Sequence, residues 1–156
     1  MARSRFLSSM PDKRANAADP HDLQRFLDVQ DRWFEQACKE LGEGRKRSHW
    51  IWFIFPQFKG LGYSATANHY GISSSQEAEA YLAHEILGTR LRRCTELVLG
   101  VKGRSIEQIF EDPDDLKFRS CMTLFAAVTA DNKVFKDALE KYFGGKPDQR
   151  TLEKLT

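Results

Sequence analysis

Apolar side chains recur at spacings of three and four residues along most of this chain, and no long run alternates between apolar and polar residues. One such series begins at Leu23 and continues through Phe26, Leu27 and Trp33 to Leu41. This spacing is that of one face of an α-helix, whereas alternation would indicate a half-buried strand. The pattern therefore predicts an all-α fold. The eleven Phe and three Trp residues further predict a core built largely on aromatic rings.

Residues that start or stop helices divide the chain into about seven helices with short connections. Asp19 is a candidate cap with Pro20 in the first turn, and glycines close the helices that end near residues 42 and 143. Further helices are expected over residues 64–70, 75–82, 84–99, 105–110, 112–128 and 148–155, each with its own cap or stop signal. We predict one compact multi-helical domain over residues 20–156, preceded by a disordered tail over residues 1–19.

Charge and hydrophobic patterning exclude several classes of function. The formal net charge is +2, too small for a general nucleic-acid-binding protein. The longest apolar run covers residues 50–56, far short of a membrane span, and the N-terminus lacks the apolar centre of a secretory signal. We therefore expect a cytoplasmic protein without a membrane partner. The three cysteines form no pattern with zinc spacing, so no metal or cofactor is predicted.

The run WIWFIFP, at residues 50–56, leaves its secondary structure open. Seven consecutive apolar residues fit a buried strand or a short buried helix equally well. Ser48 as a candidate cap favours a helix, and Pro56 would end either element.

The most informative segment for function lies between residues 44 and 70. Aromatic rings stand here beside cationic, amide and imidazole groups, and glycines flank them on both sides. Such a mixture suits a planar ring that carries an anionic group, such as a nucleotide. The ligand-binding candidates in this segment are Lys46, Ser48, Trp50, Trp52, Gln57 and Tyr70, with His49 as an acid or base.

Each of these residues also has a purely structural interpretation. Trp50 and Trp52 could be core side chains, His49 a hydrogen-bonded buried imidazole, and Lys46 an ordinary solvated lysine. The Gly-Leu-Gly at residues 60–62 has neither the spacing of a phosphate-binding loop nor that of a dinucleotide fingerprint.

Three blocks of the sequence resemble an uncharacterised bacterial domain family that is often labelled "calpastatin". The blocks are GRKRSHWIWFIFPQFKGLGYSATANHYGI, EAEAYLAHEILGTRL and DDLKFRSCMTLF, and the resemblance covers roughly residues 22–155. It implies a compact all-helical fold and no established activity. This chain has His84-Glu85 where the family usually has His-Pro, which weakens a role for His84. Polar positions of the family fall on Lys46, Ser48, His49, Gln57, Gly62, Ser64, Tyr70, His84, Arg90, Lys117 and Ser120. Apart from His49, the candidate acid or base, we expect all of these residues to bind the ligand.

Three classes of function stay open at this point. The first is an enzyme that hydrolyses a glycosidic bond of a nucleotide or ADP-ribose-like molecule, with His49 or Glu77 as the catalytic acid or base. The order of the blocks is loosely similar to small helical domains that act on ADP-ribose or phosphorylated riboflavin intermediates. The second is a ligand- or protein-binding module without chemistry. The third is a structural or interaction protein in which residues 50–55 are plain core.

Overall fold

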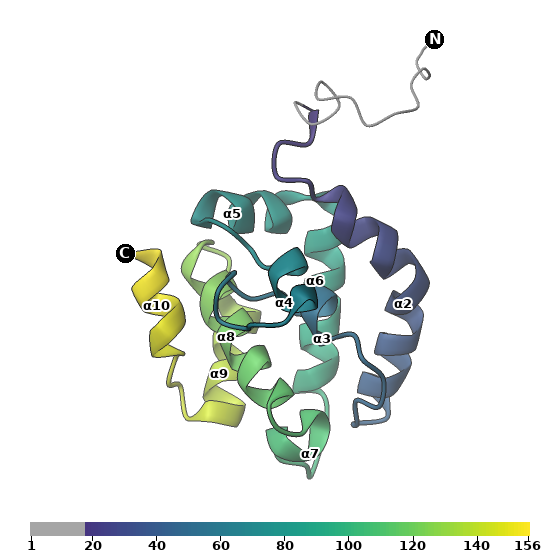
Figure 1. Ribbon diagram of the computed structural model, residues 1–156. Coiled ribbons are helices and arrows are strands. Elements are labelled where there is room, and N and C mark those ends of the chain that lie inside the picture. Colours follow the sequence, from purple (N-terminus) through teal and green to yellow (C-terminus); the bar gives the residue numbers. More distant parts are fainter. Residues whose placement is uncertain (1–17) are drawn as a thin grey trace.

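The computed structural model describes residues 18–156, so the predicted tail over residues 1–19 lies outside the described part except for its last two residues. Within this part the chain forms nine helices and no strand (Figure 1). None of these helices is long and apolar enough to cross a membrane. They are α2 (Gln24–Gly42), α3 (Ile51–Ile54), α4 (Ala65–Tyr70), α5 (Ser75–Ala83), α6 (Glu85–Leu99), α7 (Ile106–Phe110), α8 (Asp114–Ala127), α9 (Lys133–Phe143) and α10 (Gln149–Leu155).

Helices α6 and α8 form the middle of the arrangement. Helix α6 packs against α2, α3, α5 and α9, while α8 packs against α3, α5, α7, α9 and α10. Figure 1 shows α2 on one side of α6 and α8 to α10 on the other, with α5 across one end and α7 at the opposite end. The predicted all-α class is confirmed. The nine helices of the described residues exceed the predicted number of about seven, and α3 is one that is too short to show a helical period.

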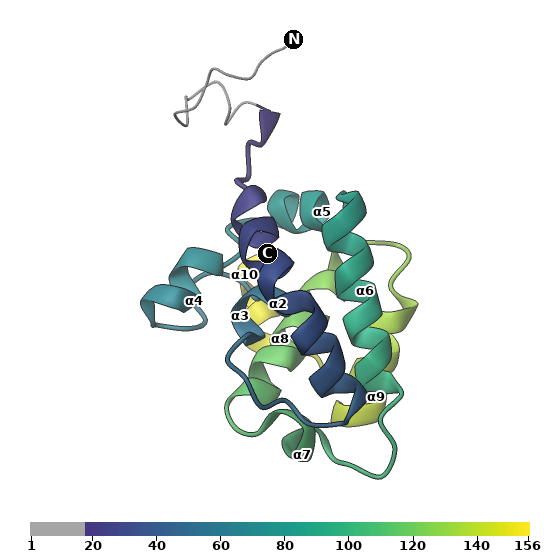
Figure 2. The same cartoon turned by 90° about the vertical axis from the view of Figure 1, so that its right-hand side faces the viewer.

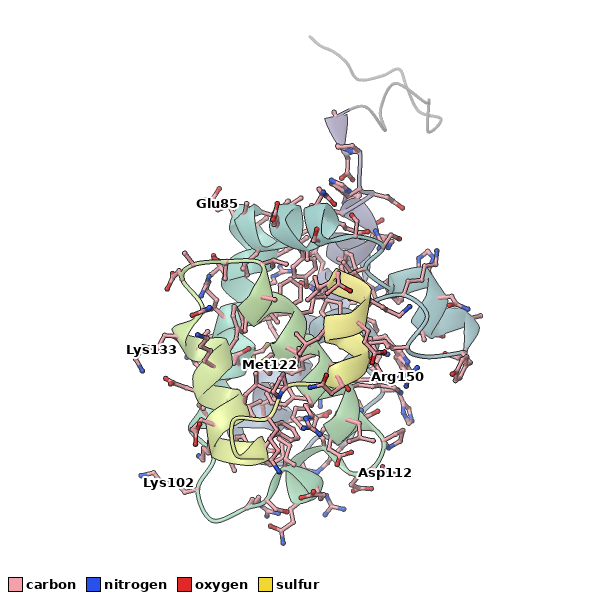
Figure 3. The ribbon with its side chains drawn as sticks, turned by 90° about the vertical axis from the view of Figure 1, so that its left-hand side faces the viewer. Glu85, Lys102, Asp112, Met122, Lys133 and Arg150 are labelled. Atoms are coloured by element: carbon pink, nitrogen blue, oxygen red, sulfur yellow. The ribbon has the colours of Figure 1, made fainter. Side chains whose placement is uncertain are left out.

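The core between these helices is built on aromatic rings, as predicted. Phe26 meets Tyr81 edge-on with centroids 5.0 Å apart, and Tyr81 lies 5.4 Å from Phe125. Phe118 stacks on Phe110 with centroids 4.9 Å apart. Such pairs contribute about 0.5–1.5 kcal/mol each beyond their burial. The side-chain view places Met122 of α8 among the surrounding helices (Figure 3).

The first described helix begins later than predicted. Asp22 has φ 51°, which breaks the helical path, and α2 starts only at Gln24. Asp19 still acts at this end, because its carboxylate accepts the backbone N–H groups of Leu23 at 2.8 Å and Gln24 at 3.0 Å. The predicted helix start, with Asp19 as the cap and Pro20 in the first turn, was therefore wrong: the N-cap is Leu23, and Asp19 binds the first N–H groups of α2 from outside the helix.

Within residues 50–56 the structure has the short helix α3 over residues 51–54, which settles the ambiguity in favour of a helix. Ser48 does not cap it. A single parallel bridge pairs Phe58 with Ile72: the Lys59 N–H donates to the Ile72 carbonyl at 2.8 Å. This bridge closes the base of the segment that carries α4, which projects from the body of the molecule in Figure 2.

Side-chain caps start several helices as the sequence predicts. Ser74 accepts the Glu77 N–H at the start of α5, and Ser105 forms a capping box with Gln108 at α7. Asp148 accepts the Thr151 N–H at α10. Each such cap typically contributes about 1 kcal/mol.

Candidate functional site

Two loops that are far apart in the sequence enclose a hollow of about 650 Å³. This volume lies within the range of about 300–1,000 Å³ of small-molecule sites. We call it the Trp52 hollow. The loop between α2 and α3 contributes Arg45, Lys46, Arg47, His49 and Trp52. The segment around the start of α8 contributes Phe110, Glu111, Asp112, Pro113, Asp114 and Lys117, and Figure 3 shows Asp112 at its outer surface.

A buried carboxylate holds the first of these loops in place. Glu40, near the end of α2, is 1% exposed. Its Oε1 accepts the backbone N–H of Arg47 at 2.7 Å, that of Ser48 at 2.9 Å, and the Trp50 indole N–H at 2.9 Å. Its Oε2 accepts the Ser48 hydroxyl at 2.6 Å and the Gln36 amide at 2.8 Å. Five donors on one carboxylate fix the path of the chain from residue 47 to residue 50.

These hydrogen bonds keep the Glu40 carboxylate ionised. Burial alone would raise the pKa of Glu40, but the hydrogen bonds from Gln36, Ser48 and the backbone outweigh burial. They lower the pKa from its ordinary value of 4.5 to about 2. At neutral pH a full negative charge therefore lies beneath the cationic turn at residues 45–47.

At the floor of the hollow, the carboxylate of Asp114 lies between the ammonium groups of two lysines, and each lysine lies over a tryptophan ring. Lys46 Nζ lies 2.8 Å from Asp114 Oδ2, and Lys117 Nζ lies 3.5 Å from Asp114 Oδ1. Lys46 Nζ also lies 5.1 Å from the centre of the Trp50 ring, and Lys117 Nζ lies 5.2 Å from that of Trp52. Cations over indole faces are attracted by the ring quadrupole, so the rings help to fix both lysines.

The rim carries weaker and more exposed pairs. Arg45 lies 3.4 Å from Glu111 and Arg47 pairs with Glu43, and both guanidinium side chains are 55% exposed. Surface pairs of this kind contribute about 0–1 kcal/mol, so they exchange easily for another anion. His49 is also exposed. The whole lining carries four cations and three carboxylates, which leaves an excess of one positive charge with His49 neutral.

Glu111 adopts an unusual backbone conformation at this rim. Its φ of 62° and ψ of 158° fall in a region that is almost restricted to glycine. Such a conformation costs about 1–3 kcal/mol and occurs mainly at functional sites. It turns the chain between α7 and α8 so that the acidic segment faces the loop at residues 45–49.

Four of the fourteen residues suggested by the sequence line this hollow: Lys46, His49, Trp52 and Lys117. Two neighbours in the sequence do not. Trp50 is 0% exposed, so its ring is a core side chain that supports Lys46, and Ser48 bonds to Glu40. Neither side chain lines the hollow where a ligand would bind.

The two candidate catalytic residues lie in different places. Glu77 is 3% exposed and pairs with Arg25 at 2.7 Å, and its other oxygen accepts the Ser73 N–H at 2.9 Å. It borders a separate hollow of about 380 Å³, which Arg25 and His69 also line. Its carboxylate already serves Arg25 and the start of α5, and the structure does not bring it together with His49.

The candidates on the α4 segment shape that segment. Gln57 is buried, and a Cβ on Gly62 would lie 3.3 Å from its Nε2 and 2.8 Å from the Ala67 Cβ. Gly62 is therefore needed for this close approach. Ser64 caps α4 by accepting the Ala67 N–H at 3.0 Å. Tyr70 packs on core rings, including Phe53 at 5.4 Å.

The three remaining candidates also have structural partners. The His84 Nδ1 accepts the backbone N–H groups of Ile86 and Leu87 and thereby caps α6. Arg90 pairs with Asp31 at 3.0 Å. The Ser120 hydroxyl lies 3.1 Å from the Asp148 carboxylate, which joins α8 to the start of α10.

Sequence reasoning missed Glu40, Glu111 and Asp112 as site residues. Glu111 and Asp112 belong to the acidic run EDPDD at residues 111–115, opposite in charge to the basic run at residues 45–47. That complementarity was the available signal for their proximity. Glu40 offered none, because a glutamate on an amphipathic helix is usually solvated. Among residues 18–156, no group of three or more His, Cys, Asp or Glu side chains could hold a metal ion.

The chain is similar to a known protein family and to a solved structure. Residues 20–155 match the family described as "Protein of unknown function (DUF1810)". The chain is 54% identical to a conserved hypothetical protein, Rv1873, from Mycobacterium tuberculosis, whose crystal structure superposes with a TM-score of 0.86. The match covers 87% of this chain and 97% of that one. No match is found among curated proteins.

Proposed function

This chain belongs to the DUF1810 family of unknown function, and on that premise we propose that its Trp52 hollow binds a small nucleotide-like molecule. Such a ligand combines a planar ring with an anionic group. The hollow provides a partly exposed indole for the ring and exposed guanidinium groups for the anion. We also propose that the protein is cytoplasmic, because nucleotides are abundant in the cytoplasm.

One observation carries the proposal. Trp52 is the tryptophan of this segment that is not sealed in the core, and it lines the same hollow as Arg45 and Arg47. Stacking of a base on an aromatic ring contributes about 1–3 kcal/mol. Guanidinium groups bind phosphate oxygens through paired N–H donors. The carboxylates that also line the hollow disfavour a long polyanion, so a small ligand fits better than a nucleic acid.

Hydrolysis of a glycosidic bond is a second candidate function, favoured by the carboxylates at the hollow. Glu111 and Asp112 join His49 there, so groups that can transfer protons are present around one space. His49→Asn separates the two functions. A hydrolase loses turnover at unchanged ligand affinity, whereas a pure binding module shows no turnover in the wild type against the same panel.

The first experiment is a thermal-shift panel of AMP, ADP-ribose, adenosine, ribose 5-phosphate and inorganic phosphate. A ligand at 100 times its Kd stabilises the native state by about 2.7 kcal/mol, which raises the Tm of a chain of this size by several degrees. We expect compounds with both ring and phosphate to give the largest shift. Equal shifts for adenosine and AMP, or no shift with any compound, would contradict the proposal.

Affinity measurements then locate the site. Trp52→Leu removes the stacking surface and should weaken AMP binding by at least tenfold in isothermal titration. Trp33→Leu is the matched control, because Trp33 is also partly buried but lies on α2 outside the hollow. Equal losses in the two variants would indicate a general loss of folding rather than a local site.

A further inference from the structure

Asp114 occupies the position in which an anionic ligand group would otherwise meet both floor lysines. Each carboxylate oxygen has its own partner: Oδ2 lies 2.8 Å from Lys46 and Oδ1 lies 3.5 Å from Lys117. The three side chains are only 6%, 18% and 21% exposed for Lys46, Asp114 and Lys117. Water screens such a cluster poorly, so its charges interact more strongly than the pairs at the surface.

The ion pairs at the rim are more exposed to solvent than the cluster at the floor. Arg45 and Arg47 are each 55% exposed, and their partners Glu111 and Glu43 are 64% and 44% exposed. Solvent therefore screens the charges of these rim pairs. A phosphate can therefore replace a rim carboxylate at little cost. At the floor it would have to displace Asp114 or lie against its negative charge.

We infer that Asp114 is a specificity-determining residue that keeps anionic groups out of the floor and thereby orients the ligand. The uncharged ring lies inward beside Trp52, and the phosphate lies outward on Arg45 and Arg47. This inference rests on the proposed function and narrows it. The ligand class becomes molecules with a neutral ring at one end and the charge at the other, such as nucleoside monophosphates, and compact polyanions such as pyrophosphate are disfavoured.

The test uses inorganic phosphate as the probe and Asp114→Asn as the variant. The substitution keeps the size of the side chain but leaves Lys46 and Lys117 without their shared counter-ion. We expect inorganic phosphate to bind the variant at least tenfold more tightly than the wild type, and to raise the Tm of the variant much more. The matched control is Asp137→Asn, which removes the partner of Lys133 on the exposed face of α9. Equal phosphate affinity in the wild type and the Asp114 variant would overturn the inference.

A measurement on the unmodified protein covers the case in which Asp114→Asn does not fold. In a nitrogen-15 NMR titration of the wild type with inorganic phosphate, the Nε–H signals of Arg45 and Arg47 should shift before the Nζ signal of Lys46. A shift of Lys46 first would overturn the inference.

AMP binding to the wild type is measured in parallel. If AMP does not bind, the proposed function fails, and the orientation fails with it. If AMP binds but phosphate affinity is unchanged by Asp114→Asn, the role of Asp114 fails alone.

Discussion

The carboxylate of Glu40 accepts the indole N–H of Trp50 across 2.9 Å, inside the protein and directly beneath the candidate site. The same indole ring supports Lys46, whose ammonium group pairs with Asp114. A chain of contacts therefore runs from the end of α2 to the floor of the Trp52 hollow. Through these contacts Glu40, which does not line the hollow, helps to position Lys46 and Asp114, which do.

Replacement of Glu40 should destabilise the protein strongly. Glu40→Gln removes the charge and introduces an amide group that cannot accept from all five donors, so buried N–H groups lose their partner. We expect the free energy of unfolding at pH 7 to fall by about 3 kcal/mol. Urea denaturation measures this change, with Glu35→Gln on the exposed face of the same helix as the control.

The effect of Glu40→Gln should also depend on pH. The pKa of Glu40 is about 2 in the folded protein against an ordinary value of 4.5. A depressed carboxyl pKa contributes stability that is fully present above the unfolded pKa and is lost as pH falls toward the folded one. The difference between wild type and variant should therefore shrink between about pH 4.5 and pH 2. A constant difference over that window would show that the charge of Glu40 does not matter.

Glycine should be better tolerated than alanine at position 111. The φ of 62° at Glu111 is unfavourable for any residue with a Cβ. We expect Glu111→Gly to be about 1 kcal/mol more stable than Glu111→Ala. Lys102 is the control, since it is exposed, lies outside the helices and has no positive φ. There the order should reverse, with alanine the more stable variant. Thermal unfolding of the four variants gives the comparison.

Alanine at position 88 should disrupt the junction of α5 and α6. A Cβ on Gly88 would overlap the backbone carbonyl oxygen of Leu82, which cannot move without shifting α5. We expect Gly88→Ala to lower the free energy of unfolding by at least about 3 kcal/mol. At Gly42, the last residue of α2, a Cβ would meet no heavy atom within 4 Å. Gly42→Ala should therefore be neutral or stabilising by about 0.5–1 kcal/mol. Urea denaturation of both variants measures the contrast.

The contribution of Asp115 to the stability of the folded protein should become less favourable as pH rises. Its Oδ1 is buried without a hydrogen-bond partner, and burial, with the nearby Asp112 and Glu107 carboxylates, raises its pKa above the ordinary value of 3.8. A raised carboxyl pKa gives a contribution that is present below pH 3.8 and is lost as pH rises through the folded value. Asp115→Asn should therefore stabilise the protein by about 1 kcal/mol at pH 7, and this gain should vanish in acid. A variant less stable than wild type at pH 7 would contradict this account.

The sequence predicted the fold where local chemistry decides it. Helices α6 and α9 show clear three- and four-residue spacing and end at glycines. The helices expected over residues 105–110 and 148–155 do begin at side-chain caps, Ser105 and Asp148. The prediction failed at the start of α2, because the positive φ of Asp22 has no sequence signal. It left α3 ambiguous, because a helix of four residues is too short to show a period.

The candidate site was predictable only in part, for a related reason. Lys46, His49 and Trp52 are close in the sequence, so one short segment indicated them together. Which of the two neighbouring tryptophans faces the hollow depends on the turn of α3, and the sequence did not distinguish Trp50 from Trp52. The approach of the acidic segment at residues 111–114 is a long-range contact that depends on how α7 and α8 pack.

The most direct test of the proposed ligand site is an NMR titration of the three indole N–H signals with AMP. Trp33, Trp50 and Trp52 are the three tryptophans of the chain, and their indole N–H signals are followed in a single sample, so the control is internal. We predict a saturable shift of the Trp52 signal while the Trp33 signal stays in place. An unmoved Trp52 signal at millimolar AMP, or a shift confined to Trp33, would contradict the assignment of the Trp52 hollow as a nucleotide site.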